Sequence, residues 1–440
     1  MRLLISAAAV AAAAAVAVTA SWGSAADPTL GGAAAVVPSD AVAFAAIDTD
    51  TSSAQSQALN ALLAKFPNLV TQLQQRFDQH TGLSWQNDVE PALGGELDLA
   101  VLPGSTPELV GLTQPADASK LAALVAKAGN GLVTRTVGSW TAIADSTSAL
   151  DALTNATATL AQNDTYVEAT SRLAGDALVR AYANGAEGQQ LLASLHGTAP
   201  STPAKLQWAS ADVVAESDGL KLQAFAQTTA PSPAAYSAQL PSEIPSGALF
   251  VADFQANGDA SAQSSSRLPA QLQALLAQLR PALGGETALY VSSGLPPTVT
   301  LVTHPADPQA AYTAIDGAVS SLASTGGIFS MIKPPLPYAV VDGALVVSTS
   351  TAGIQDYRSS GDKLSSDPAF EEAAQASGLL PGQTTGFVYA NLADVLPLVQ
   401  MLGPAAGISV PAGLDALRTL TAFGGRSGEL TTGTVFLEIK

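Results

Sequence analysis

Short runs of alternating or continuous apolar residues recur along the chain and are separated by longer amphipathic stretches. The runs "AVAFAAID", "LDLAVL", "SWTAIA" and "ALVRAYA" have the length and pattern of β-strands. The stretches 53–77, 117–128 and 146–156 predict helices. Asp117 and Asp307 stand directly before predicted helices, where an N-cap is needed. The pattern therefore predicts strands and helices mixed along the whole chain.

Several of the predicted strands are separated only by short turns. Strands joined by short turns pair antiparallel, because a parallel pair needs a long crossover connection. We therefore predict an α+β fold, with a mainly antiparallel sheet and helices packed on one face.

The hexapeptide PALGGE occurs twice, at Pro91–Glu96 and at Pro281–Glu286. Other similar segments follow in the same order, such as "VPSDAVAF" with "IPSGALFV", "LTQPAD" with "VTHPAD", and "AYANGA" with "VYANLA". Matches in one order indicate an internal duplication. The sequence predicts two tandem related units, at 37–228 and 244–440, joined by a linker at 229–243 that is rich in Pro, Ser and Ala.

Within the hexapeptide, the proline is suited to begin a last helical turn, and the two glycines to end it in the left-handed conformation. Glu96 and Glu286 then lead into strands. We interpret the hexapeptide as a structural turn. A site with paired catalytic carboxylates is the alternative interpretation.

Residues 1–26 contain Arg2, an apolar run from Leu3 to about Ala20, and small residues before Asp27, a pattern typical of a cleaved signal peptide. An uncleaved membrane anchor is the alternative, because the run borders on spanning length. Residues 27–36 then form a linker to the first unit. Both interpretations predict an exported protein, either extracellular or in the cell envelope.

Composition narrows the possible partners. Lys and Arg total 18 against 36 Asp and Glu, a net charge of −18, so the chain has no basic face for nucleic acid and would be repelled by anionic lipid. The absence of cysteine excludes disulfides, thiolate metal sites and thiol nucleophiles. Only 12% of residues are charged, which predicts a largely neutral polar surface.

The order of "VPSDAVAF", "DVEPALGGELDLAVL", "TQPAD" and "YAN" resembles the domain-of-unknown-function 3352 family of exported actinobacterial proteins. The resemblance covers nearly the whole chain after the apolar run. It implies a location in the cell envelope, with an N-terminal membrane segment in many members. It implies no catalytic residue, because the family has none assigned.

Familiar catalytic and metal-binding patterns are lacking in the sequence. The three histidines, His80, His196 and His304, lie far apart, and none has a second ligand at metal spacing. There is no nucleophile elbow and no glycine-rich phosphate loop. The acidic turns 48–51 and 257–259 are candidate calcium loops, but they lack the bidentate carboxylate that usually ends such a loop. We therefore predict no metal and no cofactor.

The two units differ most at 326–338 and 395–411, where the second unit is richer in apolar residues. Methionine suits adaptable apolar contacts, and the prolines and glycines argue against long regular elements there. The candidate ligand-binding residues are Ile328, Phe329, Met331, Ile332 and Met401. The alternative is that both segments only complete a core.

The sequence therefore favours a non-enzymatic envelope protein that binds an apolar small molecule, a lipid or an envelope protein. A carboxylate- or metal-dependent hydrolase that uses Glu96, Glu286 or Asp307 is one alternative, and a structural scaffold is another. A binding protein predicts an open apolar groove, whereas a hydrolase predicts titratable groups that converge in a polar cleft.

Overall fold

The computed structural model describes most of the chain after its N-terminal run. The described residues are 30–104, 106–129, 131–185, 187–188, 190, 206–229, 235–256, 283, 285–295, 297–323, 335–403 and 413–440. They divide into two compact units. Unit 1 comprises the described residues up to Thr229, and unit 2 those from 235 to Ile439.

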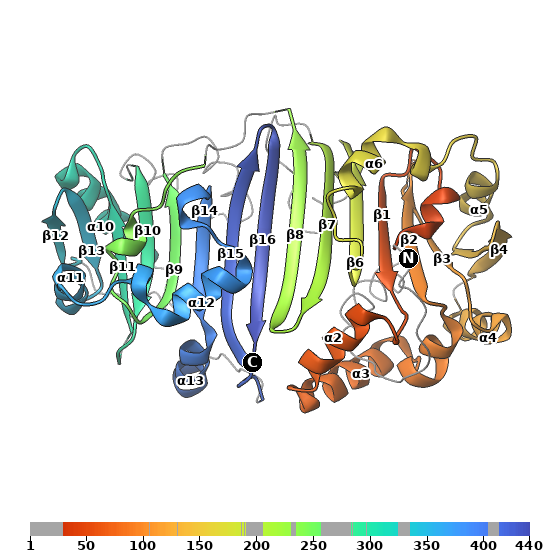
Figure 1. Ribbon diagram of the computed structural model, residues 1–440, viewed down its shortest axis with the longest axis horizontal. Coiled ribbons are helices and arrows are strands. Elements are labelled where there is room, and N and C mark those ends of the chain that lie inside the picture. Colours follow the sequence, from red (N-terminus) through yellow and green to blue (C-terminus); the bar gives the residue numbers. More distant parts are fainter. Residues whose placement is uncertain are drawn as a thin grey trace. The chain divides into compact units, whose positions relative to one another are not determined.

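Unit 1 is built on an antiparallel sheet. Its strands are β1 (Ala43–Asp48), β2 (Glu96–Leu102), β3 (Glu108–Thr113), β4 (Val133–Val137), β5 (Trp140–Ala144), β6 (Val179–Asn184), β7 (Leu206–Glu216) and β8 (Gly219–Thr228). They are ordered β4-β5-β3-β2-β1-β6-β7-β8 (Figure 1). The strands β1 and β2 are therefore central and have neighbours on both sides.

Unit 2 is also built on an antiparallel sheet. Its strands are β9 (Ala248–Gln255), β10 (Glu286–Ser292), β11 (Thr298–Thr303), β12 (Tyr338–Val341), β13 (Ala344–Ser348), β14 (Gly386–Asn391), β15 (Leu417–Ser427) and β16 (Leu430–Ile439). They are ordered β12-β13-β11-β10-β9-β14-β15-β16.

The strand orders of the two units are the same. Strand β9 takes the place of β1, β10 that of β2, and the correspondence continues to β16 and β8. All the pairings described within each unit are antiparallel. The α+β fold class is thus confirmed, and the common strand order supports a tandem duplication. The residue boundaries of the repeats stay a prediction.

Helices and short turns connect the strands. In unit 1 these are η1 (Gly32–Ala35), α2 (Ala54–Leu63), α3 (Pro67–Thr81), η2 (Trp85–Val89), η3 (Glu90–Ala92), α4 (Ala118–Ala128), α5 (Thr147–Thr154), η4 (Leu160–Gln162) and α6 (Asp164–Thr170). In unit 2 they are η5 (Leu240–Ser242), α10 (Pro308–Ala323), α11 (Thr351–Arg358), η7 (Leu364–Ser366), α12 (Pro368–Ser377), η8 (Pro381–Gln383) and α13 (Leu392–Leu402). Among the described helices, none has both the length and the hydropathy of a membrane-spanning segment.

Local sequence signals place the helix ends well, with one exception. Asp117 accepts hydrogen bonds from the first turn of α4, and Asp307 does the same for α10, as predicted. The stretch 53–77 predicts one helix, but the structure has two, α2 and α3. Pro67 stands in the first turn of α3, where its missing N–H is harmless, and Phe66 before it has a non-helical backbone with φ −128° and ψ 58°.

Helices pack on both faces of the sheet in unit 2. Successive residues of a strand face opposite sides. Val346 of β13 belongs to a core with Phe370 of α12, whereas its neighbour Leu345 packs with Ile315 of α10. The helices α11 and α12 thus cover one face of the sheet. Helix α10 covers the opposite face, whereas we predicted helices on one face only.

The repeated hexapeptide is a turn before β2, as we interpreted it, but its glycines serve a different purpose in unit 1. Pro91 lies in the short turn η3, and Gly94 has no positive φ. A Cβ atom on Gly94 would lie 1.8 Å from the carbonyl oxygen of Gln114, so glycine is required there for close backbone approach. In unit 2, Gly285 has the left-handed backbone that we predicted, with φ +63°.

A leading segment precedes the first strand of each unit. It comprises residues 30–36 with η1 in unit 1, and residues 235–243 with η5 in unit 2. Both fall within or beside the stretches predicted as linkers. In the structure, each contains a short 3-10 turn with buried apolar residues, such as Ala33 and Leu240.

Candidate functional site

Acidic side chains of β2 hold the leading segment of unit 1. The N–H groups of Gly31 and Gly32 both donate to Glu96 Oε1, the second over 3.0 Å. The N–H of Ala33 donates to Asp98 Oδ2 over 2.9 Å. Glu96 and Asp98 are two positions apart on one strand, so they lie on the same face of the sheet. We call these two residues the acid pair of unit 1.

A basic side chain also reaches the leading segment of unit 1. Arg180 of β6 donates from Nη1 to the carbonyl oxygen of Leu30 over 2.9 Å and from Nη2 to that of Thr170 over 2.8 Å. In the strand register, Arg180 lies opposite Ala46, and Ala46 lies opposite Asp98. A cation is therefore located two strands away from the acid pair, on the same face.

The leading segment of unit 2 is held in a similar way. The N–H groups of Gln239 and Leu240 donate to Glu286 Oε1 over 2.7 and 2.8 Å. The hydroxyl of Tyr236 donates to Asp253 Oδ1. We call Glu286 and Asp253 the acid pair of unit 2. Each pair combines a glutamate that begins the second strand of its unit with an aspartate further inside the sheet.

The aspartates of the two pairs lie on different strands. In unit 1, Asp98 of β2 is paired in register with Ala46 of β1. In unit 2, Asp253 of β9 is paired with Ala288 of β10. Because β9 corresponds to β1 and β10 to β2, the acid and the alanine have exchanged strands. Each sheet keeps one buried carboxyl group at the same cross-strand position.

Burial raises the pKa of both aspartates. Asp98 is 0% exposed and Asp253 is 1% exposed. Loss of hydration, with a further contribution from the charge of Glu96, raises the pKa of Asp98 to about 9. Loss of hydration, together with the charge of Glu286, raises the pKa of Asp253 to about 8, although the hydrogen bond from Tyr236 opposes the shift. Both aspartates therefore keep a proton at pH 7 in the folded protein.

A protonated acid beside a glutamate is an arrangement that active sites also use. The structure brings Glu96 to Asp98 and Glu286 to Asp253, which our sequence reasoning did not anticipate. In both pairs, however, one oxygen of each carboxyl group accepts hydrogen bonds from the leading segment, and the aspartate is buried. The geometry supports a role in holding the leading segments.

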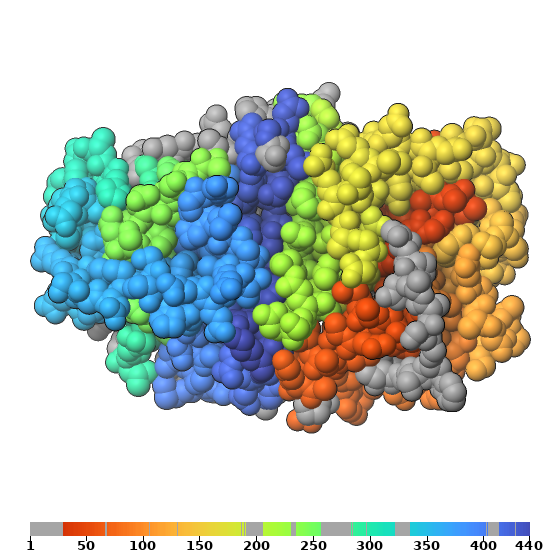
Figure 2. All heavy atoms as spheres, in the orientation of Figure 1, coloured from red at the N-terminus to blue at the C-terminus, as the bar shows by residue number. Residues whose placement is uncertain are grey.

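A surface pocket of about 300 Å³ lies in unit 2 between the leading segment and α12. Its lining residues are Ala238, Pro241, Ser242, Ser365, Phe370, Glu371, Ala374 and Pro381. Figure 2 shows the two walls on one face of unit 2, with the green surface that includes the leading segment beside the blue surface that includes α12. Most of the lining is apolar, and two serines and one glutamate supply its polar side chains.

Most of the ligand-binding residues predicted from the sequence cannot be compared with this pocket. The following lie outside the described residues: Ile328, Phe329, Met331 and Ile332. Met401 lies on α13 and is 55% exposed, and it is not part of the pocket lining. The prediction that 395–411 lacks a long regular element is wrong for its first part, because α13 continues through Pro397.

The other candidate residues do not form a site in the part of the chain that is described. His80 and His304 are exposed and lie in different units, and His196 is outside the described residues. In the first acidic turn, Asp48 accepts a hydrogen bond from the N–H of Asp50, so its carboxylate shapes the turn. Among the described residues, no group of three acids or histidines is arranged to hold a metal ion.

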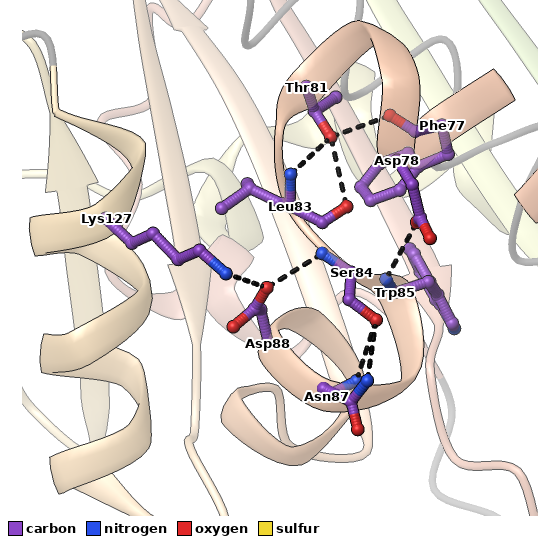
Figure 3. Close-up of polar contacts among 9 residues, drawn as sticks. All are labelled: Phe77, Asp78, Thr81, Leu83, Ser84, Trp85, Asn87, Asp88 and Lys127. Atoms are coloured by element: carbon purple, nitrogen blue, oxygen red, sulfur yellow. Dashed lines mark hydrogen bonds and ion pairs between the residues drawn. The ribbon is translucent and has the colours of Figure 1, made fainter. Parts of the chain in front are cut away.

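A polar network in unit 1 joins η2 to α4 (Figure 3). The ammonium of Lys127 and the N–H of Ser84 both donate to Asp88 Oδ2, and these hydrogen bonds lower the pKa of Asp88. The ring of Trp85 packs edge-on against Phe77, with 5.6 Å between the ring centroids. Both rings belong to a small buried core, against which Leu124 of α4 packs. This core and the polar network together join η2 to α4.

Comparisons with known proteins add little about activity. No curated protein matches the chain. The crystal structure of TP0453 in crystal form I is 11% identical with a TM-score of 0.28, and it aligns with 48% of this chain and 82% of that chain. Crystal form III gives 12% identity and a TM-score of 0.27, over 47% of this chain and 82% of that chain. The model of a family described as "Protein of unknown function (DUF3352)" matches residues 3–126, which supports a domain-of-unknown-function family over that part of the chain.

Proposed function

We propose that this protein is a non-enzymatic, exported protein of the cell envelope that binds a small apolar molecule in the pocket of unit 2. The observation that carries the proposal is the pocket itself, in which Phe370, Ala374 and three further apolar residues form most of the lining. Ligand sites are usually concave, mainly apolar and equipped with a few polar groups. The pocket of unit 2 has this composition.

The size and charge of the pocket limit the class of ligand. About 300 Å³ is at the lower end of the range for ligand pockets, so the ligand is small or inserts only one arm, such as an acyl chain. The Ser242 hydroxyl donates to the carbonyl oxygen of Gln239, so it can accept a hydrogen bond from a ligand hydroxyl or amide, and Ser365 can donate or accept one. Glu371 is exposed at the pocket, and the chain carries a net charge of −18, so an anionic head group is disfavoured. We infer a neutral or cationic amphiphile.

The hydrolase and scaffold alternatives have less support. The acids that we considered for catalysis either cap a helix, as Asp307 does, or hold a leading segment, as Glu96 and Glu286 do. A pure scaffold gives no reason for an apolar pocket at the surface. Export and envelope location rest on the N-terminal run and on the family resemblance, and they stay predictions.

Ligand binding can be measured with N-phenyl-1-naphthylamine, an uncharged probe whose fluorescence rises in apolar surroundings. The purified protein is titrated beside Ala374→Phe, which fills the pocket, and Ala376→Phe, which makes the same change on α12 away from the lining. We expect binding by the unmodified protein and the Ala376 variant, and at least a tenfold weaker affinity for the Ala374 variant. Equal affinity for all three proteins would rule out this pocket as the binding site.

The natural ligand can be sought in the same preparation. Organic extraction followed by mass spectrometry, with a blank and a charge-matched control protein, should yield a stoichiometric neutral or cationic amphiphile. An empty extract together with no binding of the probe would contradict the proposed function. Crosslinking in the envelope would then test for a protein partner.

A further inference from the structure

One wall of the unit 2 pocket is the leading segment. Ala238, Pro241 and Ser242 line the pocket, and all three belong to residues 235–243. This segment contains only the short turn η5, so its position depends on contacts with the rest of the unit. Any group that holds or releases the segment therefore changes the shape of the pocket.

The acid pair of unit 2 supplies the side-chain contacts that join this wall to the sheet. Glu286 accepts two N–H groups from the wall, those of Gln239 and Leu240, over 2.7 and 2.8 Å. Asp253 accepts the hydroxyl of Tyr236, at the start of the segment. Two backbone hydrogen bonds of 2.8 Å each also hold the wall. The N–H of Ala238 donates to the carbonyl oxygen of Pro381 in η8, and the N–H of Tyr236 donates to that of Thr384, the residue after η8.

We propose that Asp253, Glu286 and Tyr236 form a proton-sensitive attachment of the pocket wall, so that pH regulates access to the binding site of unit 2. This inference rests on the proposed function, because it concerns the same pocket. None of these three residues is part of the pocket lining. The attachment acts by setting how often residues 235–243 leave the sheet.

The surroundings of Asp253 explain why its proton matters. Glu286 approaches from β10 and Tyr236 from the leading segment, while its register neighbours Ala288 and Phe387 are apolar. Among the described residues, those that shift the pKa of Asp253 include no basic group. When Asp253 ionises in the attached state, its buried carboxylate therefore faces the half-buried carboxylate of Glu286 with no cation among the described groups that shift its pKa, which is unfavourable.

The sign of the pH dependence follows from linkage. Burial and the charge of Glu286 raise the pKa of Asp253 to about 8 in the attached state, and release into water returns it towards its ordinary value of 3.8. The attached state therefore binds the proton more tightly. The equilibrium constant for release rises about tenfold per pH unit between about pH 4 and pH 8, and it levels off above that.

Hydrogen exchange in the ligand-free full chain measures the attachment without any ligand. After correction for the intrinsic exchange rate, we expect the protection of the Gln239 and Leu240 amides to fall by about tenfold per unit from pH 5 to pH 8. The asparagine in Asp253→Asn keeps an oxygen that accepts the Tyr236 hydroxyl, but it cannot ionise. In this variant the protection of the Gln239 and Leu240 amides should therefore be independent of pH. The amide of Val346 in β13 serves as an internal control for global unfolding.

A parallel titration with N-phenyl-1-naphthylamine connects the attachment to the pocket. The affinity of the unmodified protein should decrease from pH 5 to pH 8, while that of Asp253→Asn stays constant. If Asp253→Asn does not fold, Tyr236→Phe replaces it and should lower the protection of both amides at every pH.

The outcomes separate the two proposals. Protection that is independent of pH in the unmodified protein overturns the proton-sensitive attachment, even if the probe binds. Protection that changes as expected, with probe affinity that does not change, overturns the regulation of the pocket. Protection that changes as expected while the probe binds at no pH supports the attachment and refutes the proposed ligand site.

Discussion

The acid pairs of the two units perform one structural task with different residues. In both, a glutamate at the start of the second strand accepts two N–H groups of the leading segment, and a buried aspartate adds a further contact. Asp98 stands on β2, whereas Asp253 stands on β9, the counterpart of β1. The comparison indicates that the fold needs a carboxyl group at this cross-strand position, whichever strand supplies it.

The surroundings of the two pairs differ more than their geometry does. Arg180 occupies the β6 position of the row that contains Asp98, whereas Phe387 occupies the corresponding β14 position beside Asp253. Unit 1 therefore has a cation near its acid pair. This cation, Arg180, donates a hydrogen bond to the backbone of the leading segment. Unit 2 has the hydroxyl of Tyr236 instead. The pKa of Asp98 is nevertheless raised further than that of Asp253, to about 9 against about 8, so Arg180 acts on the backbone of the leading segment and does not offset the charge of Asp98.

The largest expected effect comes from the glycines of the repeated hexapeptide. Gly94→Ala would place a Cβ 1.8 Å from the Gln114 oxygen, so we expect a loss of about 3 kcal/mol or more in the free energy of unfolding. Gly285→Ala in unit 2 should cost only about 1–2 kcal/mol, because its constraint is a positive φ. Urea denaturation measures both.

Gly95→Ala is the matched control for this difference between the copies. A Cβ on Gly95 would meet Asp50 Cβ at 3.6 Å, which is an ordinary contact. Its stability should stay close to that of the unmodified protein. A loss as large as that of Gly94→Ala would contradict the assignment of close backbone approach to Gly94.

A smaller effect is expected when the strand position of the aspartate is changed. Asp98→Ala leaves the buried N–H of Ala33 without its acceptor, which costs about 1–3 kcal/mol. Adding Ala46→Asp places a carboxyl group on the neighbouring strand, as in unit 2, and should recover part of this loss. A double-mutant cycle in urea measures the coupling between the two positions. Strictly additive losses would show that the strands are not interchangeable.

The pH dependence of stability sharpens the comparison further. For both aspartates the folded-state pKa is raised, so the stabilising contribution is complete below the ordinary value of 3.8 and is lost as the pH rises through about 9 in unit 1 and about 8 in unit 2. Urea denaturation at pH 5, 7 and 9 should show falling stability. Asp98→Asn and Asp253→Asn should each flatten the curve, and an unchanged slope in either variant would mean that its aspartate does not titrate in this range.

The smallest effect is expected at Met401. This residue is 55% exposed on α13, so Met401→Ser should change the free energy of unfolding by less than about 0.5 kcal/mol. It should also leave the affinity for N-phenyl-1-naphthylamine unchanged, because Met401 is not part of the pocket lining. A loss of affinity with unchanged stability would instead move the binding site towards α13, where our sequence analysis expected it.

Features that depend on neighbours in sequence were predictable. The caps at Asp117 and Asp307 need contacts only with the next turn, and the strand runs need only their own alternation of residues. The single helix predicted at 53–77 shows the limit of such reasoning. We took apolar spacing as the stronger signal, whereas the backbone restriction at Pro67 decides the break.

The acid pairs were only partly visible in the sequence. Aligning the two copies of the hexapeptide sets Asp98 against Ala288, and aligning the first strands sets Ala46 against Asp253. Each difference by itself is an ordinary substitution. Only the register of β1 with β2 and of β9 with β10 shows that the two changes are one exchange between facing positions.

The sequence alone determined the α+β fold class, the internal similarity and the absence of familiar catalytic motifs, because these depend on residue type and short spacing. The tertiary structure decided which acids meet, which of them keep a proton and where a pocket forms. Hydrogen bonds such as that from Ala33 to Asp98 join residues 65 positions apart, and burial depends on everything that packs around them. No local pattern encodes such a contact, so it becomes visible only when the sheet has brought its strands into register.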